Sequence, residues 1–412
     1  MGGVLIPRGT NVAADAKHAS DRLPRVAAGL FDRLREELGF DTVRLLVFWD
    51  ALEPAPGRWS ASYLTALRRL VDDAGRAGLS VVIDMHQDVF GEGFGHAGVP
   101  EHAAPGVLYD AFRPPRRWAL SYLELPVMRA FDGLWRDPSG LADAWARIAA
   151  ALRGSEALLA ADLLNEPHWG TDAPASFERS TLPEVQAALA DAVRGALPDL
   201  AVALEPAPTA SLGLGTALRS KVAPPAIYAP HFYPAALELG LGYDGDRAAL
   251  AQILETMCAD AERMGLPLLI GEVGARSDVP GSAAYLRDVY DLFDGAMVGA
   301  LQWDLSAATP YALLRPDGRP TRLARAIVRP HPSRIAGVPL GFRWEPAHAR
   351  FRVSWEESGR VQGETVLSAP RLAFPGGIIV EVEGGGPYRV ERGRVRLPQV
   401  GGRRDVVLRD VG

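Results

Sequence analysis

Two acidic residues, Glu166 and Glu272, stand at the ends of hydrophobic segments. Glu166 follows the apolar run "LLAADLL" and precedes Pro167, which cannot continue a strand, and Glu272 lies in "PLLIGEVG". A charge in such a place is costly if it is buried without a partner, so each carboxylate is either solvated or functional. Two facing carboxylates can cleave a glycosidic bond, one protonating the leaving oxygen while the other attacks the anomeric carbon.

Other polar and aromatic residues end similar apolar runs, and we regard them as candidate site residues. They are Asn11, Arg44, Asp84, His86, Asn165, Glu205, His231, Tyr233 and Trp303. Side chains two residues apart on a strand face the same side, which applies to Asp84 with His86 and to His231 with Tyr233. We expect Arg44 to keep Glu272 ionised, Asn165 to donate to a sugar hydroxyl and Trp303 to pack against a pyranose ring. Glu205 is expected to be structural or peripheral rather than a third catalyst.

The apolar runs form eight short β-type segments separated by helical patterns. They cover residues 4–12, 42–49, 80–86, 158–166, 200–206, 226–233, 267–274 and 298–305. A helix is indicated, for example, where Tyr63, Leu67 and Val71 recur on one face. This alternation predicts a parallel sheet closed into a (β/α)₈ TIM barrel, in which the C-terminal ends of the strands meet at one mouth. No glycine-rich dinucleotide fingerprint follows the first strand.

The chain is predicted to divide into a barrel, residues 1–329, and a small antiparallel β-sandwich, residues 330–412. After residue 330 the sequence alternates polar and apolar residues, as in "GGIIVEVEG", between glycine-rich turns. Residues 87–122 carry many Gly and Pro without a sustained period, which indicates a long loop at the barrel mouth.

Composition and motif content exclude several classes of protein. A formal net charge of -6 gives no support for nucleic-acid binding, and the single cysteine, Cys258, rules out a disulfide framework. His86, His96 and His102 match no zinc-ligand spacing, so we expect neither a metal nor another cofactor. The chain has no apolar run long enough to span a membrane, and its first residues lack a signal-peptide pattern, so the protein is either intracellular or exported after removal of a signal.

The motifs together resemble the active-site set of glycoside hydrolase family 5. They are "VRLLVFW", "DMHQD", "NEP", "HFY", "GEVG" and "LQWD". The residues of the family set fall on Arg44, His86, Asn165, Glu166, His231, Tyr233, Glu272 and Trp303. The resemblance implies that Glu166 is the acid/base, that Glu272 is the nucleophile and that the anomeric configuration is retained.

A narrower resemblance, to the endoglycoceramidase branch of that family, covers most of the chain. It rests on "RGTNVAADAK", "FWDALEPAPGRW", "VVIDMHQDVF" and "VMRAFDGLW". Members of the branch carry a C-terminal β-sandwich and cut between an oligosaccharide and ceramide, and the resemblance makes Lys17 and Asp84 additional sugar contacts. The sequence departs from the branch at His168, after the "NEP" motif, and in "GEGFGHAGVPEH", where we expect substrate choice to be determined.

The expected substrate is therefore a glycosphingolipid, and three alternatives stay open. The aglycone could be a steryl, alkyl or aryl group, the substrate could be a glucan or mannan, or the protein could bind carbohydrate without catalysis. Apolar residues of segment 87–135, among them Phe90, Phe94, Trp118 and Leu123, could form an apolar wall for a lipid or could pack locally. The expected partners are a glycolipid or other β-glycoside and, transiently, a micelle or membrane surface, with the protein acting as a monomer. The family resemblance implies secretion, and the cytoplasm is the alternative location.

Overall fold

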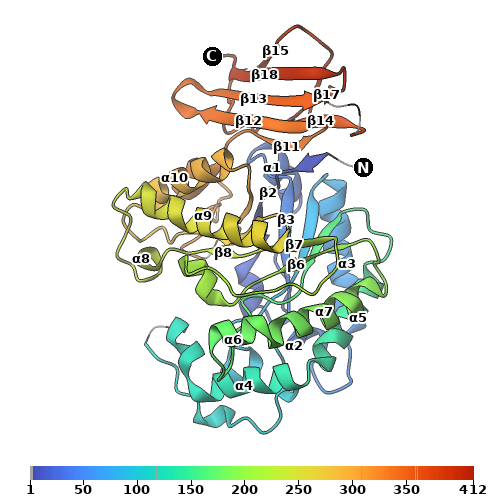
Figure 1. Ribbon diagram of the computed structural model, residues 1–412, viewed down its shortest axis with the longest axis vertical. Helices are drawn as coiled ribbons and strands as arrows, with labels where there is room; N and C mark the ends of the chain where they lie inside the picture. The colour runs from blue at the N-terminus through green and yellow to red at the C-terminus, as the bar shows by residue number, and fades with distance from the viewer. Residues whose placement is uncertain (1–2, 117, 308, 358, 360) are drawn as a thin grey trace.

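The protein consists of a parallel barrel with two antiparallel sheets stacked at one of its ends (Figure 1). The computed structural model describes residues 3–116, 118–307, 309–357, 359 and 361–412. Within those ranges, no helix combines the length and the apolar character needed to cross a membrane. The predicted fold class, a TIM barrel with a C-terminal β-sandwich, is confirmed.

The barrel sheet has the strand order β7-β6-β5-β4-β3-β2-β10-β9-β8, with every neighbouring pair parallel. Its strands are β2 (Arg8–Val12), β3 (Thr42–Val47), β4 (Ser80–Met85), β5 (Leu158–Asp162), β6 (Ala201–Leu204), β7 (Ala226–Tyr228), β8 (His231–Phe232), β9 (Leu269–Val273) and β10 (Gly299–Gln302). β7 and β8 are two pieces of one predicted strand, interrupted at Pro230, which lacks the N–H that a central strand needs. β7 also bridges to Leu268, ahead of β9, so the sheet closes on itself. All eight predicted strands are present, most of them shorter than the apolar runs.

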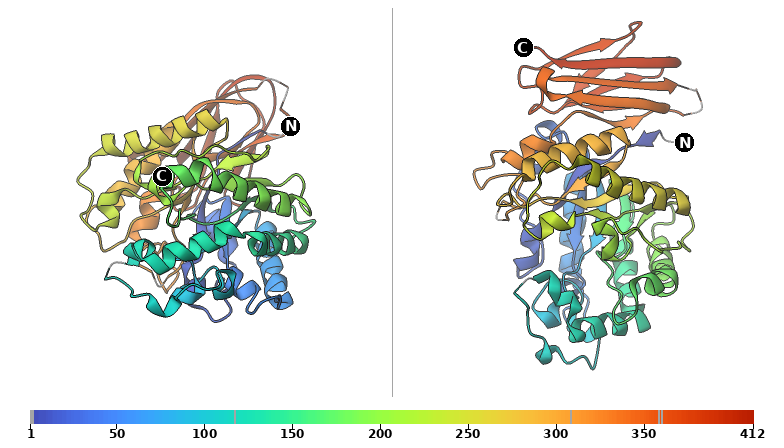
Figure 2. Two further views of the ribbon diagram at one scale, coloured as in Figure 1. Left: turned by 60° about the horizontal axis from the view of Figure 1, so that its bottom comes forward. Right: turned by 60° about the vertical axis from the view of Figure 1, so that its left-hand side comes forward.

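Helices surround the sheet and bury their apolar faces against it (Figure 2). They are α1 (Leu30–Glu36), α2 (Trp49–Leu52), α3 (Ala61–Arg76), α4 (Leu125–Arg136), α5 (Ser139–Ala151), α6 (Pro174–Arg179), α7 (Thr181–Arg194), α8 (Ala235–Glu238), α9 (Arg247–Met264), α10 (Ser282–Gly295) and α11 (Arg322–Ile327). In α3 the predicted stripe of Tyr63, Leu67 and Val71 is buried, and the Ser60 side chain caps the first turn by accepting from the Tyr63 N–H.

The barrel interior is layered. Val82, Ala160, Leu269 and Leu301 form an apolar layer inside it. Two residues further along β4 and β5 come Asp84 and Asp162, so the next layer toward the mouth is charged. A (β/α)₈ barrel is a packed core and not a pore, so these charges need partners within the same layer.

The C-terminal sheets have the orders β1-β11-β14-β17-β16 and β12-β13-β18-β15. Their strands are β1 (Val4–Leu5), β11 (His331–Ile335), β12 (Val338–Glu345), β13 (Arg350–Glu357), β14 (Glu364–Ser368), β15 (Ile378–Val382), β16 (Arg389–Glu391), β17 (Arg394–Pro398) and β18 (Gly402–Asp410). Alternate residues such as Phe351, Val353 and Trp355 point inward and form a separate core. β1 comes from the start of the chain, so the sandwich includes residues on both sides of the boundary predicted at 329/330, which stays a prediction.

The sandwich covers the end of the barrel opposite the mouth. Ser368 Oγ donates to the Gly39 carbonyl at 2.7 Å and Arg394 Nη2 donates to the Phe40 carbonyl at 2.6 Å, just ahead of β3. The long loop predicted at residues 87–122 lies at the other end of the molecule and contains the short 3₁₀ turns Glu92–Phe94, Glu101–Ala103, Tyr109–Ala111 and Trp118–Leu123 (Figure 1). The mouth and the sandwich are therefore separated by the length of the barrel.

Candidate active site

The structure brings the predicted site residues together at the barrel mouth. Arg44, Asp84, His231 and Glu272 lie in β3, β4, β8 and β9. His86, Asn165, Glu166, Tyr233 and Trp303 follow the ends of β4, β5, β8 and β10, and Lys17 lies in the 3₁₀ turn after β2. This is the arrangement that places catalytic groups in TIM-barrel enzymes.

Arg44 is the centre of the site. Its guanidinium is fully buried and contacts four carboxylates, those of Asp84 at 2.9 Å, Asp162 at 2.9 Å, Glu205 at 2.8 Å and Glu272 at 2.7 Å. It also donates to the side-chain oxygens of Asn11 and Asn165. One planar cation with five donors thus orients six side chains from five strands or strand ends.

The charges around Arg44 do not balance if every carboxyl is ionised. Burial, together with the charges of Glu205 and Glu272, raises the pKa of Asp84 well above its ordinary value, and burial and Glu205 raise the pKa of Asp162 similarly. Asp84, Asp162 and Glu205 are close enough to one another to resemble a metal site. Arg44 already contacts all three, so the cation held by this cluster is the guanidinium.

Glu272 is held as an acceptor on both of its oxygens. Arg44 Nη1 donates to Oε1 at 2.7 Å, and the Tyr233 hydroxyl donates to Oε2 at 2.9 Å. Burial and the neighbouring Glu272 charge raise the pKa of Tyr233, which keeps the hydroxyl protonated as a donor. These two donors fix both oxygens of Glu272 and so position it for attack on a sugar.

Glu166 stands on a strained turn that its neighbours hold in place. Its φ of 45° lies in the left-handed region, which costs a residue other than glycine on the order of 1–3 kcal/mol. The Glu205 carboxylate accepts from the Glu166 N–H at 2.8 Å, and the Gln87 side chain donates to the carbonyls of Asn165 and Glu166. The turn points the side chain, which is 20% exposed, into the mouth.

His231 connects the two candidate catalytic carboxylates. Its Nδ1 lies 3.0 Å from Glu166 Oε1 and 3.7 Å from Glu272 Oε2, so these two oxygens are closer than the sum of the two distances. This upper limit accommodates the separation of about 5–5.5 Å between the two carboxyl groups of retaining glycosidases. Burial alone would lower the pKa of His231, but Glu205 and Glu272 outweigh burial and raise it well above its ordinary value.

Trp303 and Lys17 lie together in the mouth. The Lys17 ammonium lies 4.3 Å from the centre of the Trp303 ring and 2.7 Å from the Asp88 carboxylate. His86 stacks on Trp303 with ring centres 5.6 Å apart and binds Asp84 through Nδ1 at 2.7 Å. Burial and Lys17 lower the pKa of His86 to about 3, so this histidine is neutral. Arg44 and Asp84 have no exposed surface, so they hold other site residues here, and their direct contact with substrate stays a prediction.

Sequence reasoning missed Asp162 and did not assign the partners of Glu205. Asp162 was not identified, because an acidic residue inside an apolar strand carries no spacing signal of its own. Glu205 was expected to be structural or peripheral, and it binds Arg44, the Glu166 N–H and, at 3.3 Å, His231 Nε2. For Glu205 the cue available in the sequence was that it follows an apolar strand, and that strand lies next to the one that leads to Asn165 and Glu166.

The two sequence departures lie beside the site. His168 is buried and stacks on Trp169 and Tyr122 at 4.0 and 5.6 Å, and its Nδ1 accepts from the Gly170 N–H. Burial lowers the pKa of His168 to about 4. The apolar residues of segment 87–135 were expected either to pack locally or to form a wall for a lipid. Phe90 and Phe94 pack in the core, whereas Trp118 and Leu123 are exposed.

Comparison with known proteins gives a consistent family assignment. Residues 22–309 match cellulase (glycosyl hydrolase family 5), and residues 329–400 match the glycoside hydrolase family 5 C-terminal domain. Endoglycoceramidase I of Rhodococcus hoagii (strain 103S) is 27% identical over 384 residues, which span 84% of this chain and 73% of that protein. The resemblance stated from the motifs is confirmed.

Solved structures agree with that assignment. The complex of endo-glycoceramidase II from Rhodococcus sp. with ganglioside GM3 has a TM-score of 0.90 and 27% identity, covering 100% of this chain and 98% of that one. A crystal structure of endogalactoceramidase has a TM-score of 0.76 at 24% identity, with 98% and 96% covered, and shares the fold.

The contacts of Glu205 lead to a testable prediction for Glu205→Gln. Since the pKa of His231 is raised in the folded protein, its charge stabilises the fold below about pH 6.5, and this contribution is lost as the pH rises through the raised value. Removing the Glu205 charge should lower that pKa, which NMR titration of the ring measures directly. A glutamine has one acceptor oxygen and cannot accept from both Arg44 and the Glu166 N–H, so loss of either contact should reduce kcat/KM roughly 10–100-fold through misplacement of the Glu166 carboxyl.

Glu184→Gln is the matched control, because Glu184 is an exposed residue of α7 that pairs with Lys221 away from the mouth. It should change neither the titration of His231 nor kcat/KM. An unchanged His231 titration in Glu205→Gln would contradict the assignment of Glu205 as a positioning residue.

Proposed function

The chain belongs to glycoside hydrolase family 5, and we propose that it releases the glycan of a glycosphingolipid by double displacement, with Glu272 as nucleophile and Glu166 as acid and base. It is a retaining glycosidase that hydrolyses the bond between a glycan and its aglycone. The observation that carries the residue assignment is the meeting of the Glu166 and Glu272 carboxylates at one nitrogen of His231, in the mouth of the barrel.

In the first step Glu272 attacks the anomeric carbon while Glu166 protonates the leaving oxygen. The C–O bond to the aglycone breaks, a bond from Glu272 to the sugar forms, and the aglycone leaves as the alcohol. Arg44 and Tyr233 hold Glu272 from its two sides, so the attacking electron pair starts from a fixed position. As the Glu272 charge is consumed, Tyr233 becomes free to donate to the sugar.

In the second step Glu166, now a carboxylate, takes a proton from water. That water attacks the anomeric carbon, the glycosyl-Glu272 bond breaks, and the sugar leaves with its original configuration. His231 Nδ1 is within hydrogen-bond distance of Glu166 and can stabilise the carboxylate during this step. Its partner Glu205 keeps the imidazole charged and oriented.

The glycone is proposed to lie between Trp303 and the polar side chains of the mouth. The Trp303 ring can pack against the apolar face of a pyranose, and Asn165 and Lys17 can donate to its hydroxyls. Asn165 is oriented by Arg44, and Lys17 by Asp88. Charged and aromatic groups of this kind suit a sugar and exclude a lipid chain from the deepest part of the site.

The aglycone is proposed to lie on an apolar rim around the mouth. Large exposed hydrophobic side chains gather on the loops that follow β4, β6 and β8, namely Leu108, Trp118, Leu120, Leu123, Leu212, Leu214, Leu239 and Leu241. Leu214 and Leu241 are 74% and 75% exposed, so their side chains are available to an apolar partner. A ceramide is such a partner, and the relatives named above are endoglycoceramidases. We propose that the monomeric protein uses the same rim to contact micelles or membrane surfaces.

The acid/base assignment predicts the behaviour of Glu166→Ala. Loss of the proton donor should abolish release of a poor leaving group such as ceramide but spare the first step on a dinitrophenyl β-glycoside. The second step then lacks its base, so a burst of dinitrophenol should precede slow turnover, and azide should restore turnover with a β-glycosyl azide as product. Stopped-flow absorbance and product NMR measure both effects; an α-glycosyl azide would contradict the assignment.

The substrate proposal is tested with a panel of glucosyl-, galactosyl- and lactosylceramide, a steryl glucoside and cellulose oligomers. We expect intact lactose from lactosylceramide, identified by chromatography of the released sugar. Cleavage of the steryl glucoside alone, or of cellulose oligomers alone, would replace the proposed substrate while leaving the chemistry unchanged.

The apolar rim is tested with the double variant Leu214→Ser/Leu241→Ser. Its KM for micellar glycolipid should rise severalfold while kcat/KM for a soluble aryl glycoside stays unchanged. Leu340→Ser is the matched control, because Leu340 is 51% exposed on the sandwich. Equal effects of the two variants on micellar substrate would contradict a role for the rim.

A further inference from the structure

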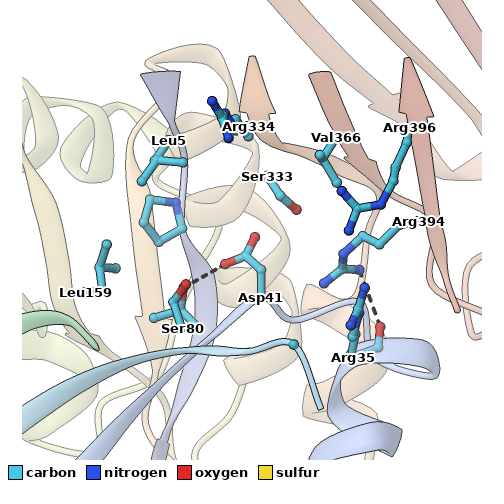
Figure 3. Close-up of a pocket in the computed structure, with 13 residues that line it drawn as sticks. Leu5, Arg35, Asp41, Ser80, Leu159, Ser333, Arg334, Val366, Arg394 and Arg396 are labelled. Carbon is cyan, nitrogen blue, oxygen red and sulfur yellow. Dashed lines mark hydrogen bonds between the residues drawn. The ribbon is translucent and has the colours of Figure 1, made fainter. Parts of the chain in front are cut away.

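A second polar pocket lies between the barrel and the sandwich, at the end of the barrel opposite the mouth. Its volume is about 170 Å³, and its lining comes from the starts of β3 and β4, from α1, and from β11, β14 and β17. Figure 3 shows the side chains that surround it. None of them belongs to the active site described above.

The pocket has an excess of positive charge. Four arginines line it, Arg35, Arg334, Arg394 and Arg396, against a single carboxylate, Asp41. Asp41 already binds His331 at 2.7 Å and accepts from the Thr42 hydroxyl at 2.8 Å. Among the described residues, Arg396 is paired with Glu391 at 2.5 Å and Glu364 at 3.7 Å, whereas Arg35, Arg334 and Arg394 have no carboxylate within salt-bridge distance.

Two of the four arginines are buried, and two carry a nitrogen without a hydrogen-bond partner. Arg35 and Arg394 are 8% and 3% exposed. The Nη1 and Nη2 atoms of Arg394 both have hydrogen-bond partners, because they donate to Ser368 and to backbone carbonyls. The Nε atoms of Arg35 and Arg334 are buried without a hydrogen-bond partner, and both residues line this one pocket, whereas Arg396 Nε is occupied by Glu391.

Buried unpaired cations are costly, and an anion removes that cost. Burial, followed by repulsion from other arginines, lowers the pKa of Arg35, and burial lowers the pKa of Arg394 to about 10. Guanidinium groups arriving from different elements suit a tetrahedral oxyanion, which accepts hydrogen bonds in several directions. At about 30 Å³ for each water-sized group, the pocket has room for such an ion with one or two waters.

We propose that this pocket binds a small tetrahedral oxyanion, of the inorganic phosphate or sulfate class, which joins the sandwich to the barrel. The ion takes the place of the missing counter-charge between β11 and β17 on one side and α1 on the other. Arg334 and Arg396 are partly exposed, so an ion can enter past them. Because the pocket lies at the far end of the barrel, the ion stabilises the fold and does not take part in catalysis.

The test is thermal unfolding of the full chain in sodium phosphate, sodium sulfate and sodium chloride at one ionic strength. Phosphate and sulfate should raise Tm saturably, by at least about 2 °C at roughly 100-fold the Kd, whereas chloride should not. Glycerol 3-phosphate forms a fourth arm, in which a rise in Tm shows that a phosphomonoester also fits. Isothermal titration calorimetry with inorganic phosphate should give one site per chain.

Three variants make the test specific. Arg334→Gln should reduce the phosphate-dependent shift at least threefold. Val366→Glu places a carboxylate among the arginines from β14, so it should raise Tm without phosphate and abolish the response. Arg343→Gln, an exposed arginine of β12 outside the pocket, should respond like the unaltered protein.

Activity on an aryl β-glycoside should stay unchanged in all three variants. An equal phosphate-dependent shift in all four proteins would overturn the proposal, because it would show a general salt effect. The absence of a saturable shift in the unaltered protein would overturn it as well, and neither result bears on the catalytic assignment.

Discussion

The guanidinium of Arg44 is the interaction on which the catalytic site depends. A fully buried cation is tolerated only because Asp84, Asp162, Glu205 and Glu272 surround it, and the same four acids would repel one another without it. Removing one partner of such a cluster typically costs about 3–5 kcal/mol, because the remaining charge stays buried. The cluster lies directly above the apolar layer of the barrel, so the scaffold fixes the position of each carboxylate.

The residues bound to Arg44 in turn position two further parts of the site. Through Asn165 and Glu205 the cluster fixes the strained turn that carries Glu166, and through Glu272 and Glu205 it fixes the charge of His231. The two carboxylates of the mouth thus differ in their surroundings. Glu272 has two donors and little exposure, whereas Glu166 is more exposed and has one histidine. That difference is what a nucleophile and a proton donor require.

Much of this arrangement could be predicted from the sequence, because a parallel barrel converts polar residues at strand ends into neighbours at one mouth. Eight apolar runs, Glu166 and Glu272 were identified in that way. Asp162 was not, since its role arises only when β3, β4 and β5 close around Arg44. Contacts between the barrel and the sandwich could not be predicted from the sequence either. The pairing of β1 with β11 and the gathering of Arg35, Arg334 and Arg394 join segments about 300 residues apart, and no local pattern reports such contacts.

The central claim is that Glu272, held by Arg44 and Tyr233, forms the covalent bond to the sugar. The most direct measurement is mass spectrometry of peptides from protein inactivated with an activated 2-deoxy-2-fluoro-β-lactoside, which slows the second step and accumulates the intermediate. The account predicts one lactosyl label per chain, on Glu272, in the peptide containing "LLIGEVG". A label on Glu166 or Glu205, or turnover of the reagent without any labelled carboxylate, would contradict it.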